Sequence, residues 1–243
     1  MHDICTTLSV VSHQQQHLVK DLLDDLKTYS CQNICVILTV NLTEGLTFKP
    51  SDYPFPISVL YNQQAKGFGA NHNQAFEQCN TPYFCVINPD VRLLSDPFNV
   101  LIAELNQYSA AVIAPLVLSP EMQAEDSVRK FPTPFTVFKK LFSKKISADY
   151  AANKVLINPD WVAGMFMLFK AEKYQLVGGF DERYFLYYED VDICKSLHKA
   201  DEKIVFSPNA SVIHAARRSS HRKMRYLFLH INSMLRFFLK HCY

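Results

Sequence analysis

The sequence predicts an α/β fold with a largely parallel, mixed central sheet flanked by helices. Apolar runs of strand length alternate with segments whose apolar residues recur at helical spacing, which is the pattern of parallel α/β sheets. The chain has 243 residues, of which 49% are hydrophobic and 20% charged, so one large domain can bury a sizeable core. No internal repeat or low-complexity linker interrupts it.

The predicted elements follow from local signals. In the first helix, four leucines fall on one face: Leu18, Leu22, Leu23 and Leu26. Asp96 followed by Pro97 is typical of a helix start. The expected strands are 4–12, 34–40, 57–61, 83–88 and 111–116, and the expected helices are 14–29, 67–79 and 96–108. We expect an irregular region, 119–160, to separate this half from a second block that begins at Trp161.

Composition excludes some classes of protein. A net charge of +2 is too small to favour nucleic acid as a partner. The seven cysteines lack CxxC spacing and the N-terminus lacks the apolar core of a signal peptide, so we expect reduced thiols and a cytoplasmic location. Because no apolar run approaches the roughly 20 residues of a membrane span, we expect a soluble or peripheral protein.

Two polar segments follow predicted strands. Segment 62–73, with Gly67 and Gly69, leads into a helix whose free N–H groups can meet phosphate or ribose oxygens. Asn88-Pro89-Asp90 follows an apolar strand and offers hard oxygen ligands for Mg²⁺ or Mn²⁺. Both segments can equally be plain turns, since these residues are turn formers.

Two later segments carry carboxylates or cations. Between Asp181 and Asp192, five carboxylates lie within twelve residues that also include aromatic side chains. Such a group favours a partly desolvated site with a general base, or else an ordinary acidic first turn of a helix. His214 ends a short β-like run before several cations, which fits either a metal ligand with a diphosphate clamp or a structural histidine.

In order and spacing, these segments resemble the family 2 glycosyltransferases, which have the Rossmann-like GT-A fold. The resemblance is nearest to the rhamnosyltransferase branch of bacterial surface-polysaccharide (O-antigen) biosynthesis. It is carried by 62–73, 88–90, Arg129-Lys130-Phe131-Pro132-Thr133-Pro134, Trp161-Val162-Ala163-Gly164, 179–192, Ile213-His214 and 217–233. It implies one GT-A domain over 1–243, with a nucleotide-binding half at 1–118, an acceptor and catalytic half at 119–220 and a basic amphipathic helix at 221–243.

The resemblance also implies roles for individual residues. Asp190 matches the catalytic base, with Glu189 beside it. Asp90 matches the main ligand of a divalent cation, Mn²⁺ or Mg²⁺, with His214 as a further ligand and Asn88 as a weaker contact. The other implied contacts are, for the nucleotide-sugar donor, Asn41, Asn62, Lys66, Gly67, Asn73, Arg218 and Arg222, and, for the acceptor, Trp161, Gly164, Asp181 and Glu182.

The implied reaction is an inverting transfer to a glycan or lipid-diphosphate-linked acceptor. One carboxylate takes the proton of the acceptor hydroxyl, and the cation offsets charge on the departing diphosphate. dTDP-rhamnose is the first donor expected, followed by UDP-hexoses. One position departs from the family: Val40-Asn41 replaces an Asp-Asn pair whose Asp contacts the base. That contact is lost or moved, with Thr39, Asn41 or Thr43 as substitutes.

The last expectations concern the C-terminal residues 221–243 and two alternative functions of the chain. Residues 221–243 mix basic and apolar side chains, so this helix can lie peripherally on an anionic membrane or pack its apolar face on the domain. A non-catalytic sugar- or partner-binding relative is one alternative, which the intact Asp90, Asp190 and His214 oppose. A sugar nucleotidyltransferase is another, which is opposed by the absence of glycine and arginine from residues 10–19.

Overall fold

The computed structural model describes residues 5–30, 33–137, 150, 157–215 and 224–241. Within them, one sheet has eight strands in the order β3-β2-β1-β4-β9-β6-β10-β5, and a second ladder joins β7 to β8. The strands are β1 (Thr6–Ser12), β2 (Ile34–Val40), β3 (Ile57–Tyr61), β4 (Tyr83–Ile87), β5 (Val91–Leu93), β6 (Ala110–Leu118), β7 (Val128–Arg129), β8 (Trp161–Val162), β9 (Phe166–Lys170) and β10 (Lys203–His214). The helices are α1 (Gln16–Tyr29), α2 (Phe68–Phe76), α3 (Phe98–Gln107), α5 (Ala171–Leu176), α6 (Glu189–Lys199) and α7 (Met224–His241), with a 3-10 turn, η1, at Pro50–Asp52.

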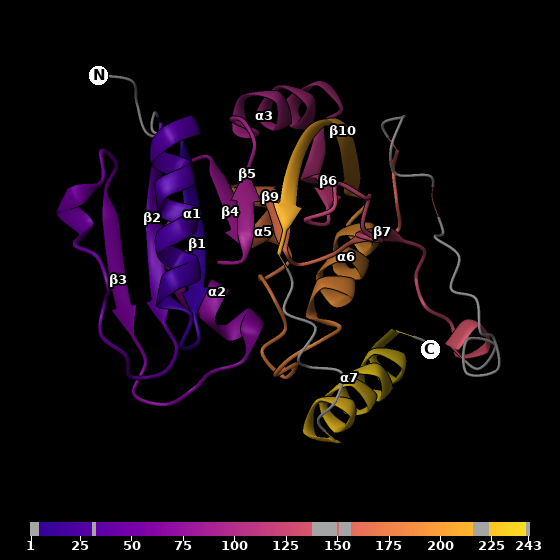
Figure 1. Cartoon of the computed structure of the whole chain (residues 1–243). Helices are drawn as coiled ribbons and strands as arrows, with labels where there is room; N and C mark the ends of the chain where they lie inside the picture. Colours follow the sequence, from indigo (N-terminus) through magenta and orange to yellow (C-terminus); the bar gives the residue numbers. More distant parts are fainter. Residues whose placement is uncertain (1–4, 31–32, 138–149, 151–156, 216–223, 242–243) are drawn as a thin grey trace.

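The sheet is mixed. Strands β3, β2, β1 and β4 run parallel to one another, as do β6 and β10. Strand β9 runs antiparallel between β4 and β6, and β5 runs antiparallel to the end of β10. The carboxyl ends of the parallel strands share the lower edge of the sheet in Figure 1. Open α/β sheets bind ligands at this edge.

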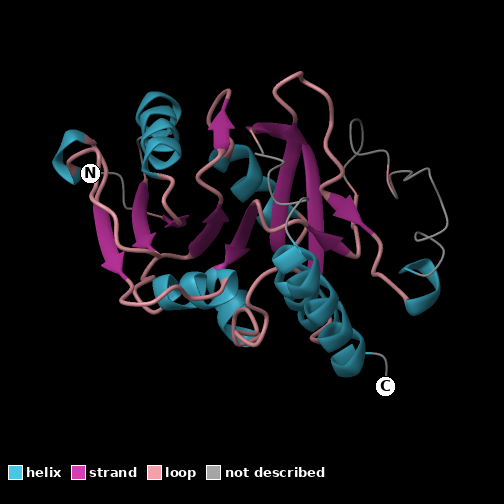
Figure 2. Ribbon diagram, turned by 60° about the horizontal axis from the view of Figure 1, so that its bottom comes forward, coloured by secondary structure: helices cyan, strands magenta, loops and turns pink. Residues whose placement is uncertain are grey.

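Helices cover both faces of the sheet. On one face, α1 and α3 bury Leu22, Leu26 and Leu101 in a first apolar core, and Figure 1 shows α1 in front of the strands. On the other face, Phe76 of α2, Tyr174 of α5 and Leu197 of α6 pack in or against a second core. Figure 2 shows the sheet between these helices. None of the described helices is both long enough and apolar enough to span a bilayer.

The elements predicted for the first half are confirmed, with small shifts at their ends. Strands β2 and β3 have the predicted bounds. Helix α1 begins two residues later than expected, because Gln14 adopts a positive φ of 60°. Helix α3 begins at Phe98, whose N–H donates to the Asp96 carboxylate at 2.9 Å, so Asp96 caps the helix from one residue further out.

The boundary expected in the sequence at Trp161 does not divide the sheet. Strand β9 fills the gap between β4 and β6, and β10 pairs with β6, so both blocks build one sheet. The region expected to be irregular also contains β7, in which Arg129 pairs with Trp161 of β8. The cause is physical: strand pairing satisfies backbone groups between distant segments, and local periodicity carries no information about it.

A charged clamp fixes β5 directly after the Asn88-Pro89-Asp90 turn. Arg92 donates to the Asp25 carboxylate of α1 through Nε at 2.6 Å and Nη2 at 2.8 Å, and the Leu93 N–H donates to it at 3.0 Å. Asp25 is only 9% exposed, so its charge depends on these donors. The clamp ties the turn to the first helix.

We expect Asp25→Ala to lower the free energy of unfolding by about 2 kcal/mol, because Arg92 and the Leu93 amide lose their acceptor in a partly buried place. Denaturant unfolding measures this change. Lys20→Ala, which breaks the exposed Lys20–Asp24 pair of 2.6 Å, is the control and should leave the free energy of unfolding almost unchanged, because water screens an exposed pair. Equal losses in both variants would show that the clamp does not hold β5.

Candidate active site

The Asn88-Pro89-Asp90 turn lies at the carboxyl end of β4. The Asn88 N–H donates to the Met165 carbonyl at 3.0 Å, which joins the turn to the residue before β9. In the pairing of β5 with β10, His214 lies opposite Val91, and the N–H of the residue after His214 donates to the Asp90 carbonyl at 3.0 Å. Asp90 and His214, predicted as metal ligands, are therefore brought together.

His214 lies between two carboxylates. Its Nε2 is 3.4 Å from Asp90 Oδ1, and its Nδ1 is 3.0 Å from Glu125 Oε2. Burial lowers the pKa of His214, but the hydrogen bonds and charges of Asp90 and Glu125 outweigh it and leave the pKa above its ordinary value. Sequence reasoning missed Glu125, which lies in the stretch expected to be irregular. Only its contact with His214 in the folded chain identifies it.

Asp90 and His214 could hold a divalent cation. Apart from His214 Nε2 at 3.4 Å, the buried Asp90 Oδ1 has no hydrogen-bond partner within the described chain. Two ligands that each lie about 2.1 Å from one ion are about 3 to 4 Å apart, and the 3.4 Å between Oδ1 and Nε2 fits this range. No group of three His, Cys, Asp or Glu side chains suited to a metal occurs in the parts of the chain that are described. The pair suits an ion whose other ligands are phosphate and water.

Strained backbone presents Glu189 and Asp190 in the first turn of α6. Tyr187 and Tyr188, just before them, have φ of 70° and 67°. This left-handed region is unfavourable for residues other than glycine, and such strain clusters at functional sites. The two carboxylates therefore start a helix whose N-terminus favours negative charge.

Helix α7 holds the strained segment in place. The Tyr188 ring packs on His230 and Phe237 of α7, with centroid distances of 5.4 and 5.6 Å. The Ser233 hydroxyl donates to the Leu186 carbonyl at 2.9 Å. Contacts from another helix thus offset the backbone strain.

Asp190 has donors that stabilise its ionised form. Its Oδ2 accepts the Gly164 N–H at 3.0 Å and its Oδ1 the Val191 N–H at 2.8 Å. Burial raises the pKa of Asp190, while these N–H groups and the charge of Arg129 oppose the rise. The result is a desolvated carboxylate with a raised proton affinity, as a general base requires.

Glu189 is in the opposite situation. It is 5% exposed, and its Oε2 has no hydrogen-bond partner among the described residues. Burial, and then the negative charge of Asp190, raise the pKa of Glu189 well above its ordinary value. Of the adjacent carboxyls, Asp190 therefore has N–H donors that favour its ionised form, whereas burial and the charge of Asp190 favour the protonated form of Glu189.

Of the predicted acceptor contacts, Gly164 touches Asp190, and Trp161 packs against the cluster that contains the next residue, Val191. The Trp161 indole N–H donates to a backbone carbonyl at 3.0 Å, and the Arg129 guanidinium lies over its ring, 5.8 Å from the centroid. A Cβ at Gly164 would lie 3.4 Å from the Phe68 ring and 3.5 Å from the Asp190 Cβ. Glycine at this position lets its N–H approach the carboxylate closely.

Asp181 and Glu182, also predicted as acceptor contacts, are bonded to other parts of the chain. The Asp181 carboxylate accepts from Arg183, at 2.8 Å from its Nε, and from Lys240 of α7 at 2.8 Å. Arg183, followed by Lys240, holds the pKa of Asp181 below its usual range. Glu182 accepts the Asn73 amide at 3.0 Å. Their contact with an acceptor stays a prediction.

Two of the asparagines predicted as donor contacts shape the turn before α2. Asn41 Oδ1 accepts the Lys66 N–H at 2.8 Å and the Asn62 amide at 2.9 Å, and the Asn41 amide donates to the Lys66 carbonyl at 3.0 Å. The Asn62 amide also donates to Asn71 at 2.7 Å. Both side chains are buried, so the structure assigns them a role in holding this turn.

The Asn73 amide, also predicted as a donor contact, is bonded to other parts of the chain. Its Oδ1 accepts the Phe180 N–H at 2.9 Å and the Tyr174 hydroxyl at 2.7 Å, while its Nδ2 donates to the Phe180 carbonyl at 2.8 Å and to Glu182. All four positions of the amide are used. Asn73 thus joins α2 to the segment before α6, and its contact with a donor stays a prediction.

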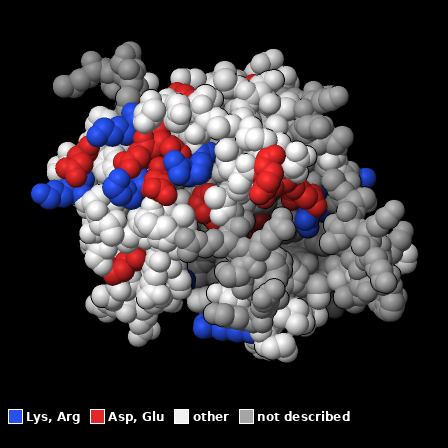
Figure 3. Space-filling view, viewed as in Figure 1, with Lys and Arg blue, Asp and Glu red and all other residues white. Residues whose placement is uncertain are grey.

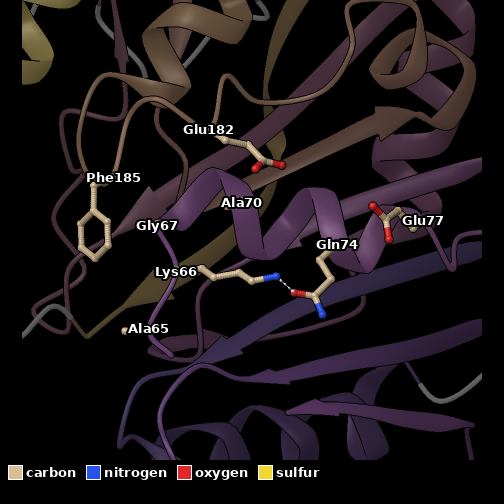
Figure 4. Close-up of a pocket in the computed structure, with 8 residues that line it drawn as sticks. All are labelled: Ala65, Lys66, Gly67, Ala70, Gln74, Glu77, Glu182 and Phe185. Atoms are coloured by element: carbon tan, nitrogen blue, oxygen red, sulfur yellow. Dashed lines mark hydrogen bonds between the residues drawn. The ribbon is translucent and has the colours of Figure 1, made fainter. Parts of the chain in front are cut away.

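A cavity of about 520 Å³ lies beside α2. Figure 4 shows the Lys66 ammonium bonded there to Gln74, with Glu77 and Glu182 nearby. It is lined by Ala65, Lys66, Gly67, Ala70, Gln74, Glu77, Glu182 and Phe185. The lining thus includes two predicted donor contacts, Lys66 and Gly67, and one predicted acceptor contact, Glu182. Asp90, Asp190 and His214 do not line it. Arg218 and Arg222 lie outside the described residues.

Solved structures define the class of this fold. The chain is similar to GalNAc-T7 with UDP, GalNAc and Mn²⁺, at a TM-score of 0.67 and 13% identity over 88% of this chain and 44% of that one. It is similar to the mannosyltransferase PcManGT from Pyrobaculum calidifontis in complex with GDP-Man and Mn²⁺, at a TM-score of 0.64 and 13% identity over 97% and 65%. The chain thus spans less than two thirds of either structure. The fold is the expected GT-A fold.

The glycosyl transferase family 2 model matches residues 13–170, and the chain belongs to this family. It is 27% identical over 224 residues to rhamnosyltransferase WbbL of Escherichia coli (strain K12), covering 87% of this chain and 83% of that protein. It is 24% identical over 261 residues to N-acetylglucosaminyl-diphospho-decaprenol L-rhamnosyltransferase of Mycobacterium tuberculosis (strain CDC 1551 / Oshkosh), covering 94% and 85%. The resemblance drawn from the motifs is confirmed.

Glu189→Gln should make the chain more stable than wild type as the pH rises. A carboxyl with a raised folded pKa contributes stability that is full below its ordinary value of 4.5 and is lost as the pH rises through the folded value. The glutamine does not ionise and avoids this loss. Denaturant unfolding of both proteins from acidic to alkaline pH measures the difference, and a difference that does not change with pH would show that Glu189 is already ionised in the fold.

Proposed function

We propose that the chain is an inverting, metal-dependent glycosyltransferase that uses Asp190 as its base. The observation that supports this best is the Asp190 carboxylate at the start of α6, desolvated yet held by the Gly164 and Val191 N–H groups. A carboxylate so placed has a fixed direction and a raised proton affinity, which general-base catalysis requires. Glu189 beside it is buried, and its pKa is raised well above its ordinary value, first by burial and then by the charge of Asp190.

The proposed transfer exchanges one bond at the sugar for another. The acceptor oxygen attacks C1 from the face opposite the nucleotide, and Asp190 takes the hydroxyl proton as the new C–O bond forms. The electrons of the broken C1–O bond leave with the nucleoside diphosphate. A single displacement inverts C1 and needs no covalent intermediate with the protein.

We place a divalent cation, Mn²⁺ or Mg²⁺, at Asp90 and His214, with Asn88 as a weaker contact. When bound, the ion supplies positive charge to the departing diphosphate. Glu125 on Nδ1 orients the His214 ring so that Nε2 faces Asp90, which is how outer carboxylates position metal-binding histidines. The two similar GT-A structures with Mn²⁺ support a cation of this class.

We propose dTDP-rhamnose as the first donor, with UDP-hexoses as the next choice. The support is that both curated relatives are named rhamnosyltransferases. For the acceptor we propose a glycan or a lipid-diphosphate-linked sugar of bacterial surface-polysaccharide assembly, since one relative is named for a diphospho-decaprenol. The enzyme would then work in the cytoplasm, peripherally at the inner face of the membrane.

Asp190→Asn should lower kcat by about 10³-fold and leave the dissociation constant of the donor near that of wild type, because only proton acceptance is lost. Product formation from a panel of nucleotide sugars gives the rate, and isothermal titration gives donor binding. Asp201→Asn, just beyond the other end of α6, is the control and should keep full activity. Full turnover in Asp190→Asn would remove it from the role of base.

Glu125→Gln should weaken Mn²⁺ binding about 10-fold to 100-fold, because the glutamine orients the His214 ring less firmly. Asp90→Ala should weaken it further by removing a direct ligand. Isothermal titration of Mn²⁺ in the presence of the nucleoside diphosphate measures both. The control is Asp126→Asn, which alters the neighbouring acid that pairs with Arg129. Unchanged affinity in Asp90→Ala, or transfer that resists EDTA, would contradict the proposed metal site.

A further inference from the structure

Helix α7 lies beyond the carboxyl edge of the sheet, and it is anchored to the region that carries Asp190 (Figures 1 and 2). Lys240 donates to Asp181 and to Asp192, both at 2.8 Å, and His241 Nε2 is 2.7 Å from Asp192 Oδ1. The side chains of Asp192 and His241 are each 2% exposed, so these contacts are largely removed from water. The inner face of α7 is therefore bound to α6 and the loop before it.

The opposite face of α7 is apolar and exposed. Phe228 is 70% exposed and Leu239 is 68% exposed. The apolar residues recur at spacings of three and four, which places them along one side of the helix. We call this face the outer stripe: Met224, Leu227, Phe228, Ile231, Leu235 and Leu239. The sequence left open whether this helix packs on the domain or lies on a membrane. Packing on the domain accounts only for its inner face, at Phe237.

The charges around the outer stripe have one sign. Arg225 is exposed and Arg236 half-buried, and both lie along one edge of the stripe at helical spacing. The sequence from Lys203 to Tyr243 contains no Asp or Glu. In Figure 3, the uncovered surface over α7 is uncharged or basic. Apolar surface edged by cations complements a surface that is apolar beneath and negatively charged above.

We propose that the outer stripe docks on an anionic lipid bilayer. Helix α7 has 18 residues, which at about 1.5 Å per residue form a rod that can lie in the headgroup plane. The stripe would then enter the acyl boundary while Arg225 and Arg236 meet lipid phosphates. A second copy of the chain fits less well, because two such helices would bring their basic edges together without an acidic partner.

This inference deepens the proposed function, since it identifies the surface by which the enzyme meets a lipid-borne acceptor. The anchoring of α7 to Asp192 gives the docking a consequence. Asp192 lies two residues after Asp190 on α6, so a bilayer that holds α7 also sets the height of the base above the lipid. Acceptors whose sugar lies close to the lipid headgroup would be favoured.

The test is co-sedimentation of the full chain with vesicles of phosphatidylcholine, with or without phosphatidylglycerol. We expect binding to the anionic vesicles that weakens as salt is added, because lipid charge is screened. Phe228→Ser combined with Leu235→Ser should lower the ratio of bound to free protein about tenfold or more, by removing apolar surface from the contact. Leu176→Ser, at a leucine of α5 that is 58% exposed, is the matched control and should bind like wild type.

Three results would overturn the proposal: no sedimentation of wild type with anionic vesicles, wild-type sedimentation of the double variant, or a dimer in light scattering that the double variant abolishes. The last would make the stripe an interface between copies. Transfer to an acceptor without a lipid should be unchanged in the double variant, and circular dichroism should show intact helices. Asp190→Asn should still sediment, so failure of the transfer chemistry and failure of docking are separate outcomes.

Discussion

The pairing of β5 with the end of β10 is what brings the two halves of the chain together at the candidate metal site. Strand β5 has only three residues, and its hydrogen bonds to β10 could not hold it alone. The Asp25–Arg92 clamp supports it from α1, while β10 is supported by β6 along most of its length. The register between β10 and β6 shifts between Ser207 and Ser211, and such irregularities bend a strand. The approach of His214 to Asp90 is therefore a property of the whole sheet.

The segment at the start of α6 has a conformation that is costly in free energy. Two consecutive tyrosines in the left-handed region cost about 1–3 kcal/mol each, and burying adjacent carboxyls adds a desolvation penalty. Packing around them offsets this cost, since Tyr184 and Phe237 are almost fully buried in the core cluster that joins α6 to α7. Removing α7 would therefore relax the segment that presents Asp190, although α7 itself contributes no catalytic group.

Much of the first half could be predicted from the sequence, because β1, β2, β3 and β4 are strongly apolar and lie beside neighbours in a parallel block. The motifs also identified Asp90, His214, Glu189 and Asp190, which the structure places in two pairs. Glu125 could not be predicted, since no periodic signal marks a residue in irregular backbone. The saturation of the Asn73 amide was equally hidden, because it depends on Tyr174 and Phe180, about a hundred residues further along the chain.

The position of β9 has a consequence for how the chain acquires its structure. Strands β4 and β6 are early in the sequence, but they do not pair with each other, because β9 lies between them. Until Phe166–Lys170 has left the ribosome, β4 exposes one unpaired edge, and β6 exposes both, because its other neighbour, β10, comes later still. Such non-local closure is slow, and open edges invite association with other nascent chains. The sheet that begins in the first 118 residues is therefore completed by segments that are synthesised after them.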